Sequence, residues 1–222
     1  MEERVSIDRC LKEYDKAKGL IPDGVKGMHK IYSVEHYPAY FTKGKGCFVY
    51  DLDNNEYIDF VMGKGPYILG YAQEEVDSKV VEQIKLGCLF PIANTLHNQV
   101  AKQIIDKIPS VEQVLFYKTG SCATTAAIRI ARIYTGRKMI LSSGYHGWHD
   151  WCNSGDDIVD GVSEAFYDFE YDLNVLDRLM LEKKDQIAAV IVTPEEYYFS
   201  KEFYQYIQKK CHEDQILFIL DE

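Results

Sequence analysis

The sequence predicts an α/β protein in which helices cover both faces of a mostly parallel sheet. After Ser110, short and almost wholly apolar runs alternate with amphipathic segments, which is typical of such a sheet. The composition, 46% hydrophobic and 27% charged, is that of a globular protein. A length of 222 residues provides one or two hydrophobic cores. These observations exclude intrinsic disorder and collagen-like repeats.

The part before Ser110 predicts an amino-terminal α+β segment. Residues 6–18 carry apolar side chains at helical spacing and end at Gly19, which predicts a short amphipathic helix. Residues 47–61 contain two β-type runs separated by Asp53, Asn54 and Asn55, which favour a tight turn. We therefore expect a hairpin or meander here.

Two further helices are predicted at residues 74–86 and 97–108, ended by Gly87 and Pro109. Apolar residues recur along each of them at intervals of four, so we expect these stripes to face inward: Val76, Val80 and Ile84 in one helix, and Val100, Ile104 and Ile108 in the other.

The remainder predicts the parallel sheet itself, joined by right-handed crossovers. The expected strands are the apolar runs at 114–117, 139–142, 187–192 and 216–220. The expected helices lie at 123–134, 173–183 and 200–212. We place the boundary between the amino-terminal segment, residues 1–109, and the partial α/β domain, residues 110–222.

Charge and cysteine usage limit the partners and the compartment. The 25 Lys and Arg against 35 Asp and Glu give a net charge of -10, which argues against nucleic acid and anionic lipid as partners. No apolar stretch predicts a membrane span, and the amino terminus lacks a signal-peptide core. The six cysteines form no Cys-x-x-Cys pair, which favours reduced thiols. We expect a cytoplasmic protein.

The first candidate site is the turn between an expected strand and the helix that begins near Ser121. Gly120 permits close backbone approach, and the helix start, with the hydroxyls of Thr119 and Ser121, offers donors for a phosphate. Ordinary helix capping by Thr119 or Ser121 is an alternative explanation.

The second candidate is the segment Ser143-Gly-Tyr-His-Gly-Trp-His-Asp-Trp-Cys152, which follows an expected strand. Its aromatic and imidazole side chains indicate a surface for stacking on a planar ligand. A metal site at His146, His149 and Asp150 is an alternative, although the spacing matches no standard ligand pattern. A second alternative is that these aromatic side chains form a packing cluster without a ligand.

The third candidate is Asp221, an acid at the end of an apolar strand. Burial of this carboxylate is costly without a cationic partner, and a protonated ring nitrogen of a cofactor is one such partner. A helix cap or a solvated chain end is the alternative.

Together these segments resemble the class III aminotransferases and their glutamate-1-semialdehyde aminomutase branch, which are fold type I enzymes of pyridoxal phosphate. The order of motifs carries the resemblance: Thr-Gly-Ser-Cys-Ala123, Ile-Tyr-Thr-Gly-Arg137, Gly-Tyr-His-Gly-Trp-His-Asp150 and Ile-Leu-Asp-Glu222. Upstream, residues 21–25, 46–60 and 65–70 extend it over nearly the whole chain. The resemblance implies the large domain of that fold, in truncated form.

The resemblance also implies pyridoxal 5′-phosphate as cofactor and assigns residues to it. Gly120 and Ser121, helped by Cys122, bind the phosphate in this interpretation. Tyr145 stacks on the pyridine ring, and His146 shapes the same loop. No metal is implied.

Asp221, in the same interpretation, pairs with the pyridine nitrogen and keeps it protonated, so that the ring accepts electrons from the substrate. The lysine that forms the Schiff base is absent from this chain and is expected beyond its end, together with the carboxyl-terminal remainder. Thr193-Pro stands where relatives usually have Glu-Pro.

The implied function is amino-group transfer through a Schiff base, of the transaminase or 2,1-aminomutase type. The expected partners are a small amino donor and a keto or aldehyde acceptor, and the full-length form is expected to be a homodimer. The fragment alone is expected to be inactive. The alternative is a non-catalytic truncated homologue that acts as a binding or assembly partner.

Overall fold

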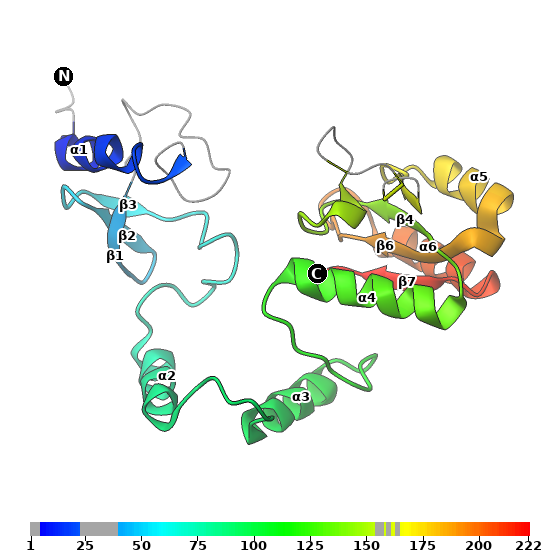
Figure 1. Cartoon of the computed structure of the whole chain (residues 1–222), viewed down its shortest axis with the longest axis horizontal. Coiled ribbons are helices and arrows are strands. Elements are labelled where there is room, and N and C mark those ends of the chain that lie inside the picture. Colours follow the sequence, from blue (N-terminus) through cyan, green and yellow to red (C-terminus); the bar gives the residue numbers. More distant parts are fainter. Residues whose placement is uncertain (1–4, 23–39, 154–157, 159–160, 163–164) are drawn as a thin grey trace. The chain divides into compact units, whose positions relative to one another are not determined.

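A computed structural model describes residues 5–22, 40–153, 158, 161–162 and 165–222. The chain divides into two compact units, Met1–His97 and Asn98–Glu222, which are described separately (Figure 1). The expected domain boundary after residue 109 stays a prediction. Of the segment 21–25 that contributes to the family resemblance, residues 23–25 lie outside the described residues.

The first unit contains a three-stranded antiparallel sheet in the order β1-β2-β3. Its strands are Phe41–Lys45, Phe48–Asp51 and Glu56–Ile58. The predicted hairpin is confirmed as β2 and β3, and Asn54 in its turn has a φ of 67°. Strand β1 was not predicted, because its sequence lacks the alternation of apolar and polar residues and its side chains are mostly exposed.

Helix α1, Asp8–Ala17, is held to the hairpin by the Asp53 carboxylate. This carboxylate accepts hydrogen bonds from the backbone N–H groups of Arg9 and Cys10, each at 3.0 Å. Although desolvation by itself raises the pKa of the Asp53 carboxyl, the hydrogen bonds from Arg9 and Cys10 outweigh it and lower the pKa below its ordinary value. Asp53 thus caps α1 from a distant part of the chain.

Replacing Asp53 with alanine is expected to destabilise the first unit by about 1 kcal/mol, the usual loss when a helix cap is removed. Because the pKa is lowered on folding, the stabilisation is present above the unfolded pKa of about 4 and is lost as the pH falls through the folded value. Amide hydrogen exchange at Arg9 and Cys10 reports the effect. Asp53→Asn, which keeps an acceptor oxygen, should retain most of the protection at neutral pH, and equal protection in all three proteins contradicts the capping role.

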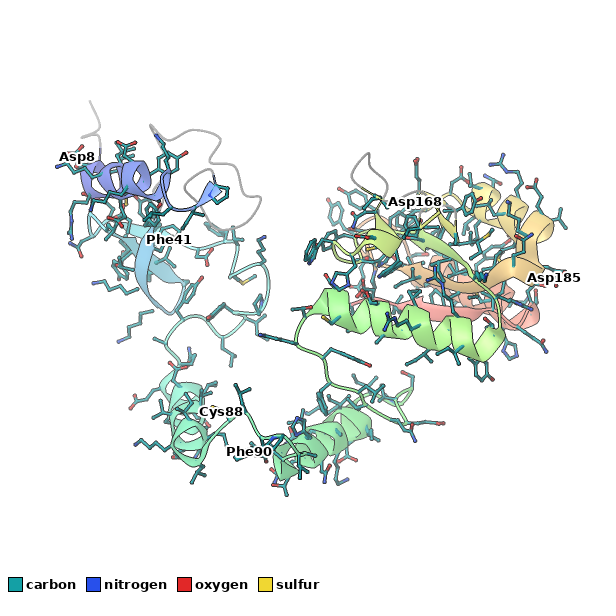
Figure 2. The ribbon with its side chains drawn as sticks, viewed as in Figure 1. Asp8, Phe41, Cys88, Phe90, Asp168 and Asp185 are labelled. Carbon is teal, nitrogen blue, oxygen red and sulfur yellow. The ribbon has the colours of Figure 1, made fainter. Side chains whose placement is uncertain are left out.

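Helices α2, Glu74–Leu86, and α3, Thr95–Lys107, confirm the two predicted helices within two residues of the expected bounds. The prediction that their apolar stripes face inward is wrong for the described residues. Val76, Val80 and Ile84 are about half exposed, and neither helix has a buried residue. Cys88 and Phe90, labelled in Figure 2, lie in the exposed segment between these helices. Helical spacing predicted the helices but not what covers them.

The second unit contains a four-stranded parallel sheet in the order β5-β4-β6-β7. The strands are Phe166–Asp168, Met139–Ser143, Ile187–Val192 and Leu217–Leu220 in that order. The helices are α4, Gly120–Thr135, α5, Leu173–Lys183, and α6, Lys201–Glu213. Three predicted strands and all three predicted helices are confirmed. Strand β5 was missed because its three residues are too short to show a pattern.

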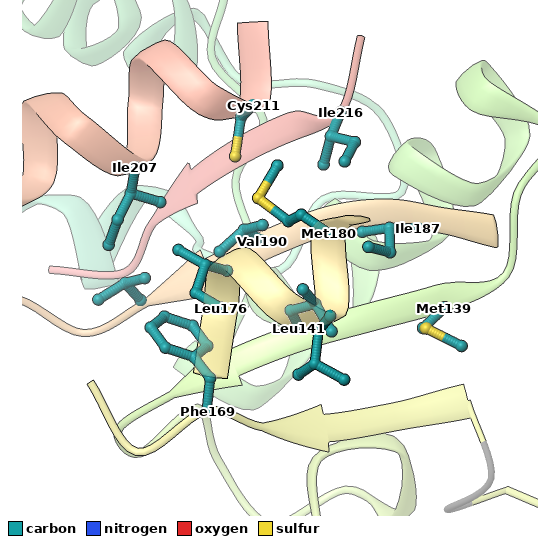
Figure 3. Close-up of a cluster of buried hydrophobic side chains, with 12 residues drawn as sticks. Met139, Leu141, Phe169, Leu176, Met180, Ile187, Val190, Ile207, Cys211 and Ile216 are labelled. Atoms are coloured by element: carbon teal, nitrogen blue, oxygen red, sulfur yellow. The ribbon is translucent and has the colours of Figure 1, made fainter. Parts of the chain in front are cut away.

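Side chains on the two faces of this sheet build separate cores. On one face, Ile128 and Ala131 of α4 pack against a cluster that includes Ile140 and Ile191. On the other, Leu176 and Met180 of α5 and Ile207 and Cys211 of α6 point onto the strands (Figure 3). The six residues of β6 are all fully buried. The structure thus confirms a parallel sheet covered on both faces.

The predicted strand at 114–117 is wrong. In the described residues this segment is not a strand, and Leu115, Phe116 and Tyr117 are half to two-thirds exposed. A strand requires a neighbour for its backbone hydrogen bonds, and no described strand lies beside this run.

No helix among the described residues is long and apolar enough to cross a membrane.

Candidate functional site

Three segments far apart in the sequence meet at the carboxyl edge of the parallel sheet. Trp148 N donates to Ser121 Oγ at 3.4 Å, which joins the loop after β4 to the start of α4. His146 Nδ1 lies 2.8 Å from Asp221 Oδ2, which joins the same loop to the end of β7. The structure therefore brings the three predicted candidates together, at the edge where open parallel sheets bind ligands.

The start of α4 is built to receive an anion. The Thr119 side chain accepts a hydrogen bond from Cys122 N at 3.2 Å, so the capping predicted as an alternative is present. The first turn of α4 contains no acidic residue, and a Cβ added at Gly120 meets no atom within 4 Å. The positive end of the helix thus has no acidic side chain in its first turn, and the space beside Gly120 is open.

A glycine allows the loop to approach this helix start. Gly147 has a φ of 110°, and a Cβ added to it lies 2.3 Å from Ser121 Oγ. Either feature excludes a larger residue without a shift of the loop. Thr124 Oγ1 also donates to the carbonyl oxygen of His146 at 2.8 Å, which fixes the loop from the second turn of α4.

Tyr145 is an aromatic side chain of the loop that is open to a ligand, as is Trp148, which is 71% exposed. The Tyr145 ring is 75% exposed, whereas its carbonyl oxygen accepts a hydrogen bond from Thr193 Oγ1 at 2.9 Å. The backbone is therefore held while the ring is available for stacking. Tyr171 supports the same region, because its hydroxyl donates to the Thr193 carbonyl at 2.8 Å. Burial raises the pKa of Tyr171 to about 12, so this donor stays protonated.

His146 and Asp221 form the centre of the site. The His146 ring is buried, and the Asp221 side chain is 25% exposed. Asp221 is placed by its own backbone, whose N–H donates to Val192 O at 2.9 Å. Within the described residues, Oδ1 of Asp221 accepts no hydrogen bond, so one carboxylate oxygen is available to a cation.

Sequence reasoning singled out the segment with His149 and Trp151 but missed Thr125, which joins these two side chains behind this centre. Trp151 Nε1 donates to Thr125 Oγ1 at 2.8 Å, and that hydroxyl lies 2.8 Å from His149 Nδ1. The inward stripe of α4 is Thr124, Ile128 and Ala131. The position of Thr125, next to Thr124 of this stripe in a helix rich in alanine, is the signal that could have revealed it.

The metal alternative receives no support from the geometry. The Nδ1 atoms of His146 and His149 already contact Asp221 and Thr125. Among the described residues, the group whose ligand atoms lie close enough for a metal is Cys10, Asp51 and Asp53, in the first unit. Its carboxylate oxygens accept hydrogen bonds from N–H and O–H donors of the protein.

The arrangement has three binding capacities at one edge of the sheet. The start of α4 can hold an anion, the Tyr145 ring can cover a flat group, and the Asp221 carboxylate can pair with a cation.

Comparison with known proteins identifies the family. The profile described as Aminotransferase class-III matches residues 31–222. The chain is 42% identical over 199 residues to the 3-aminobutyryl-CoA aminotransferase of Cloacimonas acidaminovorans, covering 87% of this chain and 48% of that protein. It is 33% identical over 204 residues to the glutamate-1-semialdehyde 2,1-aminomutase of Methanosphaera stadtmanae, covering 86% and 48%.

A solved structure shares the fold. The FumI protein of Sphingopyxis sp. MTA144, in its PLP internal aldimine form, matches with a TM-score of 0.86 and 26% identity, covering 96% of this chain and 54% of that one. The chain thus spans about half the length of the relatives it matches. The fold type I architecture expected from the resemblance is confirmed, and the chain belongs to the class III aminotransferase family.

Proposed function

We propose that this chain supplies the cofactor-binding half of a pyridoxal 5′-phosphate enzyme that transfers amino groups. The observation that carries the proposal is the meeting of the α4 start, the Tyr145 loop and Asp221 at one edge of the sheet. The residues present fit this cofactor, because each binding capacity of the site matches one part of it. When bound, pyridoxal phosphate supplies an electron-accepting ring and a carbonyl that reacts with amines.

The phosphate is assigned to the start of α4. The Gly120 and Ser121 backbone, the Ser121 hydroxyl and the neighbouring Cys122 offer donors around an open space at the positive end of the helix. A phosphate carries about two negative charges near neutral pH, so the dipole of α4 and the unneutralised first turn both favour it.

The ring is assigned to Tyr145 and Asp221. The exposed Tyr145 ring covers one face of the pyridine, and the loop that carries it is held by the backbone of His146. Asp221 pairs with the ring nitrogen and holds a proton on it. Its carboxylate can do so because the side chain is partly buried and one of its oxygens accepts no hydrogen bond from the described residues. His146, which contacts the Asp221 carboxylate, belongs to the same site.

The reaction type and the partners follow from the family and are part of the proposal. We propose an amino donor and a keto or aldehyde acceptor as substrates, with transaminase and 2,1-aminomutase chemistry as the two forms. The relatives named above include one protein of each kind. A cytoplasmic homodimer and a Schiff-base lysine after residue 222 remain predictions from the sequence.

Reconstitution tests the cofactor. The protein expressed from its complete reading frame is expected to bind pyridoxal phosphate and to absorb visible light. After reduction with borohydride, the cofactor should stay covalently attached to the protein. Incubation with an amino donor such as glutamate or 3-aminobutyryl-CoA should then bleach the visible band. Binding without bleaching by any amine favours the non-catalytic alternative. A colourless protein that borohydride does not label contradicts the proposal.

Replacing Ser121 with alanine is expected to weaken pyridoxal phosphate binding roughly 10- to 100-fold, because a hydrogen bond to a charged group contributes about 1.5–3 kcal/mol. The dissociation constant is measured by titration of the visible band. Ser78→Ala, an exposed serine in α2, is the matched control and should bind as wild type does. If the two variants bind pyridoxal phosphate with equal affinity, Ser121 is not part of the phosphate site.

A further inference from the structure

We propose that His146 is a positioning residue, which acts through Asp221 by fixing the orientation of its carboxylate. The inference rests on the proposed function, because it concerns how Asp221 is aimed at the ring nitrogen. The contact that motivates it joins His146 Nδ1 and Asp221 Oδ2 at 2.8 Å across 75 residues of sequence.

The hydrogen bond has a defined direction. A carboxylate oxygen only accepts, so Nδ1 of His146 carries the proton. Its other ring nitrogen, Nε2, is buried and has no hydrogen-bond partner in the described part of the chain. The geometry thus places a proton on Nδ1, and the buried Nε2 makes no hydrogen bond to the described residues. Through Nδ1 the ring donates to the Asp221 carboxylate.

The surroundings hold the imidazole in this position. Trp151 stacks on it, with ring centroids 6.3 Å apart and an interplanar angle of 20°. Trp151 is itself fixed by its hydrogen bond to Thr125. Thr193 Oγ1 lies 3.4 Å from Nδ1, so the donor faces the hydroxyl of Thr193 as well as Asp221. One tautomer and one orientation of the ring satisfy these contacts together.

The imidazole is not needed to hold the loop. The loop is fixed by backbone atoms: the carbonyls of Tyr145 and His146 accept hydrogen bonds from Thr193 and Thr124, and the Trp148 N–H donates to Ser121. None of these three hydrogen bonds uses the His146 side chain, so we expect them to persist when it is replaced. A loss of function in a His146 variant is then attributable to Asp221 and not to a displaced loop.

Paired substitutions separate a positioning role from a structural one. The amide nitrogen of asparagine, like Nδ1, lies two bonds from Cβ, whereas that of glutamine lies three bonds away, like Nε2. We expect His146→Asn to keep turnover within about fivefold of wild type, because it retains the donor to Asp221. His146→Gln and His146→Leu should each lose roughly 10- to 100-fold, the effect of losing a hydrogen bond to a charged group.

The outcome for these variants is read at saturating cofactor in the protein from the complete reading frame. Recovery of activity by asparagine but not by glutamine supports the proposal, with thermal stability measured in parallel. Equal losses in the asparagine and glutamine variants overturn it, since a packing role does not distinguish the two amides. Wild-type turnover in His146→Leu also overturns it.

A second measurement needs no cofactor. In the apoprotein with ¹⁵N-labelled histidine, the signal assigned to His146 through its loss in His146→Leu should show the Nδ1–H tautomer, and Asp221→Ala should shift it. The Nε2–H tautomer together with normal pyridoxal phosphate binding refutes the positioning role alone. The Nδ1–H tautomer in a protein that never binds pyridoxal phosphate refutes the proposed function.

Discussion

Replacing Asp221 with alanine is expected to lower the rate of amino transfer roughly 10²- to 10⁴-fold. Removing one member of a buried charge pair costs about 3–5 kcal/mol, and each 1.4 kcal/mol is a factor of ten in rate. In the proposed site Asp221 would hold a proton on the ring nitrogen of the cofactor, and its removal would make the ring a weaker electron acceptor. The expected loss is in kcat, because the phosphate and ring-face contacts remain.

The measurement is the rate of the half-reaction with a saturating amino donor, followed by the change in visible absorbance. Glu222→Ala is the matched control, since this adjacent acid is exposed and the carboxylate bound to His146 is that of Asp221. Its rate should stay near that of wild type. Near-normal turnover in Asp221→Ala refutes the assigned role, and an equal loss in both variants points to a nonspecific effect of charge.

Replacing Gly147 with alanine is expected to raise the dissociation constant of pyridoxal phosphate by roughly 10- to 100-fold. The new Cβ lies 2.3 Å from Ser121 Oγ, and the φ of 110° is itself unfavourable for alanine by about 1–3 kcal/mol. The loop and the start of α4 have to separate to relieve both. Separation moves the Tyr145 ring and the Ser121 hydroxyl apart, so the phosphate and the ring lose contacts together.

Gly136→Ala provides the matched control for backbone strain. Gly136 ends α4 with a φ of 69°, and a Cβ added there meets no atom within 4 Å. This variant should lose about 1–2 kcal/mol of stability and keep its cofactor affinity. Cofactor affinity and thermal stability are measured in both proteins. If Gly147→Ala loses only stability, the close approach of the loop to α4 is not part of the cofactor site.

The strands and helices were predictable where local pattern and burial agree. All six residues of β6 are buried, and the apolar run at 187–192 predicted the strand with the same bounds. Helices α2 and α5 also have the predicted bounds, because their spacing and end residues are local signals. These features depend on the chain itself and not on what it contacts.

The wrong predictions concern segments whose structure depends on contacts with other parts of the protein. The run at 114–117 has the composition of a strand, but it belongs to neither sheet of the described residues. Val76, Val80 and Ile84 have the spacing of a buried stripe, yet within the described residues they are about half exposed. A pattern predicts which face of an element is apolar, and it does not specify the surface that buries that face.

The sequence by itself determined the α/β class, the family resemblance and the identity of the candidate residues, because these depend on residue type and spacing. Only the tertiary structure decided that Ser121, His146 and Asp221 lie together. The strand order β4-β6-β7 places the His146 loop and Asp221 at one edge, and the hydrogen bond from Trp148 N joins Ser121 to that loop. It also decided the direction of the His146–Asp221 hydrogen bond, which depends on burial and on which atoms lie nearby. Contacts between residues 75 positions apart arise from packing, and a local sequence pattern does not specify packing.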